Sequence, residues 1–478
     1  MTDRTPREQF AVSMAALLRN NLHAYVHRAF LELHPGTAFL TAFYIRAICY
    51  ELERVARGEV RRLLIILPPR HLKSHCASVA FSIWFLARNP SMTVVGASYN
   101  ADLAQTFSAQ ARRLLEAPWH SAAFPQLQLD PRKASAEELR IRHFGGRRIA
   151  TSVGGTFTGK GSNLTIIDDP LKADDAFSEA RRDDVYDWIT STVISRFDDP
   201  KRGALVVVAQ RLHIDDLAGR LMETGDWHVL QLPAIAPVSQ AIDIGEGLIW
   251  NRERGELLHP ERIDEATLEQ IRKELGTAAF EAQYQQQPAP AEGHIIRPEW
   301  FGSYPKALPR KQYEAVVQSW DVAVVPGNSN SFTVCTTWGL IEDKIDLIDV
   351  TRVRLEMPDI ERLAHKLYLS WRPNLVVIEA SHTGVGLYQY LRQRGICEAR
   401  TSTPKGSKEE RMSVLTPMLE SGQVRLPTAA LWLEAFLEEC GQFPLGKFDD
   451  QVDTLSQMLR VVRKGTHELR HCTRYKTK

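Results

Sequence analysis

The chain has 478 residues and a formal net charge of +1, and its 44% hydrophobic and 24% charged residues are typical of an ordinary globular protein. This length allows two or three domains, and the balanced charge neither requires nor excludes a nucleic-acid partner. The amino-terminal residues lack the apolar stretch of a secretion signal, no run has the apolar length of a membrane span, and the six cysteines form no C-x-x-C pair. We therefore expect no secretion signal, no membrane span, a reduced compartment and no structural zinc.

Apolar residues in 9–57 recur at helical spacing, and the segment 34–37 interrupts them with a proline and a glycine. This pattern predicts two helices that pack into a core.

An aliphatic run at 63–67 predicts a buried strand, and the breaker-free segment 74–88 predicts a helix. Between them stands Pro68-Pro69-Arg70-His71-Leu72-Lys73-Ser74. A strand, a tight turn and a helix place backbone N–H groups where a phosphate can bind, so residues 69–74 are a candidate ATP-binding loop. Lys73 would contact the β- and γ-phosphates and Ser74 would bind Mg²⁺, although Leu72 stands where such loops have glycine. The alternative is a helix with a surface lysine.

Strands are next predicted at 93–98 and 164–168, with a helix at 101–116. The alternation of strands and helices predicts an α/β fold with a mostly parallel, doubly wound sheet. Asp168 and Asp169 end the second of these strands. At the carboxyl edge of the sheet, Asp168 would hold Mg²⁺ and Asp169 would deprotonate the attacking water. The alternative is a strand-ending turn.

Two glycine-rich segments, 144–149 and 154–161, suit either close approach to a polyanion or a plain hairpin. A further strand is predicted at 204–209, with Gln210 and Arg211 at its carboxyl end. Polar side chains there can sense the γ-phosphate, or they are simply a solvated strand end.

Loops and one polar helix, 265–287, make up residues 237–298, which we interpret as a connector. The predicted organisation is an ATPase domain at 1–236, a connector or lid region at 237–298, a nuclease domain at 299–463 and a basic tail at 464–478.

The second domain carries carboxylates at strand and helix ends. Strands are predicted at 316–323, 331–339, 345–353 and 375–380, and a helix begins near residue 449. Asp321 and Glu379 lie on two of these strands, and Asp450 and Asp453 share one face of the helix. Converging carboxylates can bind two Mg²⁺ or Mn²⁺ ions that cut a phosphodiester, as in a ribonuclease H-like nuclease. A helix cap is the alternative for Asp449 and Asp450.

Together these motifs closely resemble the large subunit of tailed-phage DNA-packaging terminases. The resemblance is carried in order by the 68–74 loop, Ile166-Ile167-Asp168-Asp169-Pro170, Arg211-Leu212-His213 with Asp215-Asp216-Leu217, Ser319-Trp320-Asp321, Ile378-Glu379 and Asp449-Asp450-Gln451-Val452-Asp453. It implies an ATPase that translocates double-stranded DNA into a procapsid and a nuclease that cuts concatemeric viral DNA. It also implies that Gln210 and Arg211 form the coupling motif. Asp169 stands where many such motors have glutamate, and Gln210 stands where threonine is frequent.

The resemblance further implies a small terminase subunit, the portal protein and a homo-oligomeric ring on the portal as partners. It places the protein in the bacterial cytoplasm, possibly monomeric in solution and absent from the mature virion. Arg70 is a candidate to stabilise the transferring phosphoryl group, and Arg112, Arg113 and Arg211 compete for that role. Two alternatives stay open: an ATPase-nuclease of the repair or helicase type, and an inactive prophage remnant that acts as a binding protein.

Overall fold

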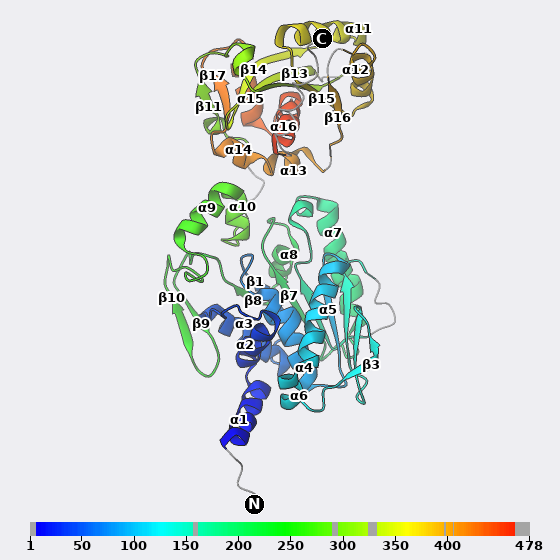
Figure 1. The fold of residues 1–478 in the computed structure, drawn as a ribbon, viewed down its shortest axis with the longest axis vertical. Coiled ribbons are helices and arrows are strands. Elements are labelled where there is room, and N and C mark those ends of the chain that lie inside the picture. The colour runs from blue at the N-terminus through cyan, green and yellow to red at the C-terminus, as the bar shows by residue number, and fades with distance from the viewer. Residues whose placement is uncertain are drawn as a thin grey trace, which may run out of the picture. The chain divides into compact units, whose positions relative to one another are not determined.

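The computed structural model describes residues 6–155, 161–288, 295–323, 332–395, 398–404 and 406–463. Part of the second glycine-rich segment (156–160) and the predicted basic tail (464–478) lie outside these ranges. Two units divide the chain, Met1–Pro290 and Ala291–Lys478 (Figure 1). The predicted connector stays a prediction, and its residues up to 290 fall within the first unit.

The sheet of the first unit has the strand order β3-β4-β5-β2-β6-β7-β1-β8 among the described residues. The strands from β5 to β8 are parallel, whereas β3 and β4 pair antiparallel at one edge. The strands are β1 (Arg62–Ile66), β2 (Thr93–Ser98), β3 (Leu129–Ala134), β4 (Glu138–Ile141), β5 (Arg147–Ser152), β6 (Leu164–Asp168), β7 (Ala204–Ala209) and β8 (His228–Gln231).

Alternate residues of each parallel strand pack into two different cores. Leu63 and Ile65 of β1 belong to the core formed with the amino-terminal helices, whereas Leu64 and Ile66 belong to the core under α7 and α8. Helices therefore cover both faces of the sheet, as continuous aliphatic strands require. The helices are α1 (Pro6–Asn20), α2 (Leu22–Leu33), α3 (Phe43–Ala56), the π-helix His75–Phe81, α4 (Ser82–Arg88), α5 (Ala101–Glu116), α6 (Pro118–Ala123), α7 (Glu179–Asp187), the π-helix Trp188–Val193 and α8 (Leu217–Glu223).

The carboxyl ends of β1, β7 and β6 meet at one edge of this sheet, with β7 in the middle. Ile66 of β1 pairs with Ala209 of β7, and Val208 of β7 pairs with Asp168 of β6. The predicted phosphate loop, the Gln210 segment and the acidic strand end consequently lie along the same edge. This is the edge at which open parallel sheets bind ligands.

Two stretches of the first unit contain one helix more than predicted. Residues 9–57 form three helices, because the Asn21 side chain accepts the backbone N–H of Ala24 and starts α2 there. Residues 265–287 form α9 (Glu265–Leu275) and α10 (Thr277–Gln283), because Gly276 takes a φ of 79° that ends α9. The first glycine-rich segment connects the antiparallel strands β4 and β5, which is the hairpin alternative. An antiparallel ribbon of β9 (Gln240–Asp243) and β10 (Ile249–Arg252) precedes α9.

In the second unit the sheet order is β11-β17-β14-β13-β12-β15-β16. β12, β13 and β14 form an antiparallel meander, and β15 and β16 add to it in parallel beyond β12. The strands are β11 (Gly302–Tyr304), β12 (Ala315–Asp321), β13 (Thr333–Ile341), β14 (Lys344–Val353), β15 (Leu375–Glu379), β16 (Ala399–Ser402) and β17 (Val424–Pro427).

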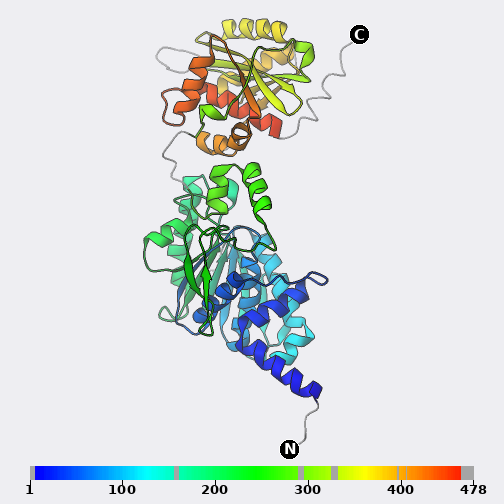
Figure 2. The same ribbon diagram turned by 90° about the vertical axis from the view of Figure 1, so that its left-hand side faces the viewer.

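The two faces of this second sheet are covered by different helices (Figures 1 and 2). One core holds α11 and α12, and the other holds α14, α15 and α16. These helices and the short α13 are α11 (Met357–Trp371), α12 (His382–Gln393), α13 (Lys408–Ser413), α14 (Thr416–Glu420), α15 (Leu433–Gln442) and α16 (Asp450–Arg463). No helix among the described residues has the length and apolar character needed to cross a bilayer.

A polar clasp holds α16 on the sheet. Ser319 donates a hydrogen bond to the carbonyl of Thr454 (2.9 Å), and the buried Gln457 amide reaches Ser319 Oγ (2.9 Å) and the Val377 carbonyl (3.1 Å). Because these partners lie on β12 and β15, the clasp sets the height of α16 over both strands. Asp453 stands one helical turn before Gln457.

Candidate functional site

The predicted phosphate loop has an unusual backbone. Arg70 and Leu72 have φ values of 64° and 54°, and Asp169 at the neighbouring strand end has a φ of 44°. A non-glycine residue in this left-handed region costs about 1 to 2 kcal/mol. Such strain concentrates at functional sites, and here it occurs where two predicted halves of one site meet. Leu72 therefore holds the conformation that a glycine would adopt more easily.

Lys73 lies between the two halves. Its side chain is buried, and its Nζ lies 3.0 Å from Asp169 Oδ1. The preceding part of the loop is also held in place, because His71 is buried and its Nδ1 lies 2.8 Å from the Pro69 carbonyl. Burial lowers the pKa of His71 to about 4, so this ring is neutral at pH 7.

Asp168 accepts hydrogen bonds from two serines of one helical segment. Ser74 Oγ donates to Oδ1 (3.1 Å) and Ser78 Oγ donates to Oδ2 (2.5 Å). Burial, and next the charge of Asp169, raise the pKa of Asp168 to about 7 despite the serines and Lys73. Ser74 and Asp168 are thus close enough to share one cation. Ser78 was missed from the sequence, although its position four residues after Ser74 predicts the same helix face.

The two residues of the predicted coupling motif, Gln210 and Arg211, differ in their surroundings. Arg211 is buried, and its Nε lies 2.9 Å from Asp216 Oδ1, while its backbone N–H donates to Gln286 Oε1 (3.0 Å). The Arg211 guanidinium is thus held in a buried ion pair with Asp216. Gln210 Oε1 is buried and accepts no hydrogen bond from any described residue. Gln210 is the member of the pair with an acceptor available at the sheet edge.

The competing arginines lie in different settings. Arg112 pairs with Glu116 on the surface of α5 (2.8 Å), and Arg113 donates to the Glu32 carbonyl (2.7 Å). Arg70 is exposed within the phosphate loop itself. Among these three, Arg70 is the side chain that the loop presents to solvent beside Lys73.

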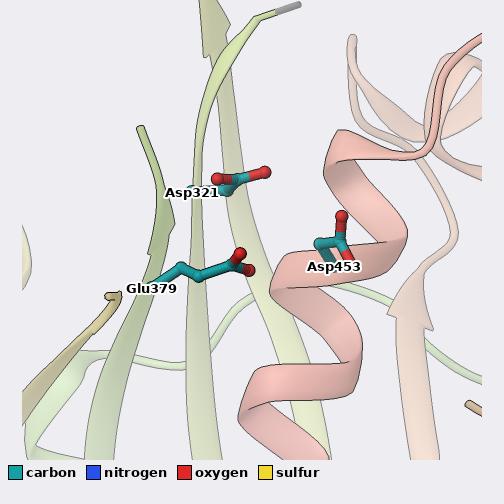
Figure 3. A group of neighbouring side chains, drawn as sticks. All are labelled: Asp321, Glu379 and Asp453. Atoms are coloured by element: carbon teal, nitrogen blue, oxygen red, sulfur yellow. The ribbon is translucent and has the colours of Figure 1, made fainter. Parts of the chain in front are cut away.

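In the second unit, Asp321, Glu379 and Asp453 bring their carboxylates together. Their ligand oxygens all lie within 4.8 Å of one another. Asp321 and Glu379 extend from the ends of β12 and β15 toward Asp453 on α16 (Figure 3). Burial, followed by the charge of Glu379, raises the pKa of Asp321 to about 8. Burial also raises the pKa of Glu379, with Asp453 as the next cause.

Asp450 lies on α16 beside this group but not within it. Its Oδ2 accepts the backbone N–H of Phe332 (3.4 Å), and burial raises its pKa to about 6. The structure therefore favours Asp453 over Asp450 as the helix-borne member, and the predicted role of Asp450 in metal binding stays a prediction. Two basic residues that the sequence analysis missed, Lys408 and Arg411, contact Asp453 from α13.

The two sites suit different ligands. Three clustered carboxylates, two of them with raised pKa values, form a hard oxygen donor set of the kind that Mg²⁺ and Mn²⁺ prefer. Lys73, Ser74 and Asp168 offer a cation, a hydroxyl and a carboxylate beside a strained loop at a helix start, which fits a phosphate chain with its Mg²⁺.

The fold and the candidate sites together define a class: an α/β unit with a candidate phosphate loop, joined to a unit with a meander-based mixed sheet and a group of carboxylates that could hold a metal ion. Residues 318–460 match the family model of the terminase RNaseH-like domain. The large terminase of a thermophilic bacteriophage aligns with a TM-score of 0.52 at 10% identity, over 87% of this chain and 99% of that chain. The chain therefore has the fold of a phage large terminase, and the predicted fold class and resemblance are confirmed.

Two further solved structures are similar. The large terminase of bacteriophage HK97 aligns at 12% identity with a TM-score of 0.37, over 86% of this chain and 90% of that chain. The large terminase nuclease of thermophilic phage G20c with bound zinc aligns at 18% identity with a TM-score of 0.28, over 34% of this chain and 95% of that chain. No curated protein sequence matched the chain.

Proposed function

We propose that this protein is the large subunit of a phage terminase, an ATP-driven motor that translocates double-stranded DNA into a procapsid and cuts concatemeric DNA. The observation that carries the proposal is the convergence of Asp321, Glu379 and Asp453 within a terminase RNaseH-like domain. A separate phosphate-loop site in the same chain supplies the second activity. DNA contacts of a translocating motor would be mainly to phosphates, because the motor must hold any sequence.

In the ATPase unit, Lys73 and the N–H groups of residues 69–74 would bind the phosphates of ATP, and Ser74 with Asp168 would hold Mg²⁺. Lys73 now pairs with Asp169 at 3.0 Å. A γ-phosphate that drew Lys73 away would leave Asp169 free to orient and deprotonate water. Gln210 would sense the phosphate through a water molecule that donates to its free Oε1, and Arg70 would stabilise the charge that develops on the phosphoryl group.

In the nuclease unit, Asp321, Glu379 and Asp453 would hold divalent ions, with Asp450 as a further candidate. Such ions supply the Lewis acidity that activates water and stabilises the leaving oxygen of a phosphodiester. Because the pKa of Asp321 is raised to about 8, its carboxyl is mostly protonated in the free centre at pH 7, so ion binding would release a proton.

The proposed partners are a small terminase subunit that selects the DNA, the portal protein, and further copies of this chain in a ring. The proposed location is the bacterial cytoplasm, with transient attachment to the procapsid portal.

Plasmid cleavage and ATP hydrolysis by the full chain test the proposal. With Mg²⁺ or Mn²⁺, we expect plasmid cleavage that Asp321→Ala abolishes and Asp343→Ala preserves, because Asp343 is an exposed turn residue. Lys73→Ala should abolish ATP hydrolysis and leave cleavage intact. Folded wild-type protein that neither cleaves DNA nor hydrolyses ATP would overturn the proposal, and DNA unwinding without procapsids would favour a repair enzyme.

A further inference from the structure

Two basic side chains of α13 lie against the carboxylates of the nuclease centre. Lys408 Nζ lies 2.6 Å from Asp453 Oδ2 and 2.7 Å from Asp449 Oδ2, and Arg411 Nη2 lies 2.7 Å from Asp453 Oδ1. Both oxygens of Asp453 therefore have a cationic partner. Asp453 is also one of the three grouped metal-ligand candidates.

The local sequence explains why α13 presents this pair. Ser407 and Glu410 form a capping box that starts the helix, so Lys408 and Arg411 stand three residues apart on one face. Arg411 is additionally bound to the carbonyl of Gly406 and is almost fully buried in its side chain, at 9% exposure. The Lys408 side chain is 41% exposed and has a flexible stem. Arg411 is thus the fixed partner of Asp453, and Lys408 is the partner that can leave.

Lys408 and a divalent ion would compete for the same oxygens. Burial alone would lower the pKa of Lys408, but its hydrogen bonds to Asp449 and Asp453 outweigh burial and raise it, so the ammonium stays charged. A metal ion that approached Asp453 would meet this positive charge and an occupied Oδ2. The ammonium and the ion would repel each other across one carboxylate, so metal binding at Asp453 favours separation of the ammonium from it.

We propose that Lys408 is a competing cation: it occupies the free nuclease centre, and a DNA phosphodiester takes it over when metal binds. This inference rests on the proposed nuclease function and adds a positioning residue to it. Once ion binding has removed the proton of Asp321, the four carboxylates Asp321, Glu379, Asp449 and Asp453 carry four formal negative charges, and Lys408 and Arg411 carry two positive ones. One divalent ion would neutralise the set, and a second would leave excess positive charge that a phosphodiester anion can balance.

The exchange couples metal binding to DNA binding. Metal displaces the ammonium that DNA then binds, so each ligand raises the affinity for the other by the same factor. Without DNA, the protein would bind metal weakly. The nuclease centre would therefore stay inactive until DNA is bound in the correct position.

Mn²⁺ titration without DNA tests this directly. The full chain is titrated by calorimetry in an Asp168→Asn background, which removes a ligand of the ATPase site. Lys408→Met keeps the length and apolar stem of the side chain without its charge, and Lys344→Met is the control, because Lys344 contacts Asp343 on a turn. We expect Mn²⁺ to bind about tenfold more tightly to Lys408→Met, corresponding to about 1.4 kcal/mol, and unchanged to the control.

The second measurement is the affinity for a short fluorescent DNA duplex with and without Ca²⁺. We expect Ca²⁺ to strengthen duplex binding more in the wild type than in Lys408→Met. Unchanged or weaker Mn²⁺ binding by folded Lys408→Met would overturn the proposal, as would failure of both proteins to bind Mn²⁺. Lys408→Gln replaces the methionine variant if that variant unfolds. Neither measurement depends on DNA cleavage. Absence of cleavage would therefore overturn the nuclease function without making Mn²⁺ binding by Lys408→Met unchanged or weaker, so the two failures can be distinguished.

Discussion

Replacing Asp321 by asparagine should stabilise the metal-free second unit. The pKa of Asp321 is raised from 3.8 to about 8, chiefly by burial. Below pH 3.8 the carboxyl is protonated in both the folded and the unfolded chain, so it contributes no penalty. Between pH 3.8 and 8 the unfolded chain loses the proton and the folded chain keeps it, so stability falls by about 1.4 kcal/mol per pH unit. At pH 7 this amounts to at most about 4 kcal/mol.

Asparagine has nearly the same volume and no charge, so Asp321→Asn removes this penalty. We expect a gain of about 2 to 4 kcal/mol at pH 7 and little gain at pH 4. Scanning calorimetry of the full chain in EDTA measures it as a rise in the unfolding temperature of the second unit, by about 2 to 4 °C for each kcal/mol. Asp343→Asn, whose side chain is 74% exposed, is the control.

Added Mg²⁺ should reverse the order, because wild-type protein gains binding energy that the variant loses. The reasoning would be refuted if Asp321→Asn lowered the unfolding temperature in EDTA at pH 8, or changed it equally at pH 4 and pH 8.

Three further predictions concern other residues. Leu72→Gly should leave the first unit about 1 kcal/mol more stable than Leu72→Ala, because both variants lose the partly buried side chain but only glycine relieves the left-handed backbone. Equal midpoints in urea unfolding would argue against strain at this position. Ser78→Ala removes a hydrogen bond that lowers the pKa of Asp168, so more of this carboxyl is protonated at low pH in the variant. The rate of ATP hydrolysis should therefore fall by a larger factor at pH 6 than at pH 8.5, and an equal fall at both would contradict this role of Ser78. Gln457→Glu removes the donors of the buried clasp and should destabilise the second unit by about 2 to 4 kcal/mol in thermal unfolding; an unchanged midpoint would show that the clasp does not hold α16.

Buried parallel strands were predictable because their aliphatic runs are strong local signals. The strands at 93–98 and 204–209 and the helix Ala101–Glu116 occur at the predicted bounds. β3 and β4 were not predicted, because Leu129-Asp130-Pro131-Arg132-Lys133-Ala134 has the composition of a loop. Pairing with neighbours, rather than local preference, determines such an edge.

The candidate sites show the same division between features that the local sequence predicts and features that depend on contacts between distant segments. The order of acidic strand ends along the chain was sufficient to predict that Asp321 and Glu379 lie together with an acidic residue of the later helix. The choice between Asp450 and Asp453 was not, because residues three apart share a helix face, and the clasp of Gln457 with Ser319 decides which one stands over the strands. Lys408 was missed since its capping box predicts only where a helix starts. Nothing local signals a contact with Asp453.

The central place of β7 has a mechanical consequence. This strand is hydrogen bonded to β1 on one side and to β6 on the other, so the proposed phosphate loop and the proposed catalytic carboxylates follow strands of one continuous hydrogen-bonded ladder. Sliding either strand along β7 would break a row of buried hydrogen bonds at once. The sheet would therefore stay rigid during the proposed ATP hydrolysis. If the proposed motor function holds, the movement that drives DNA would therefore arise in the loops and helices that leave the carboxyl edge of the sheet.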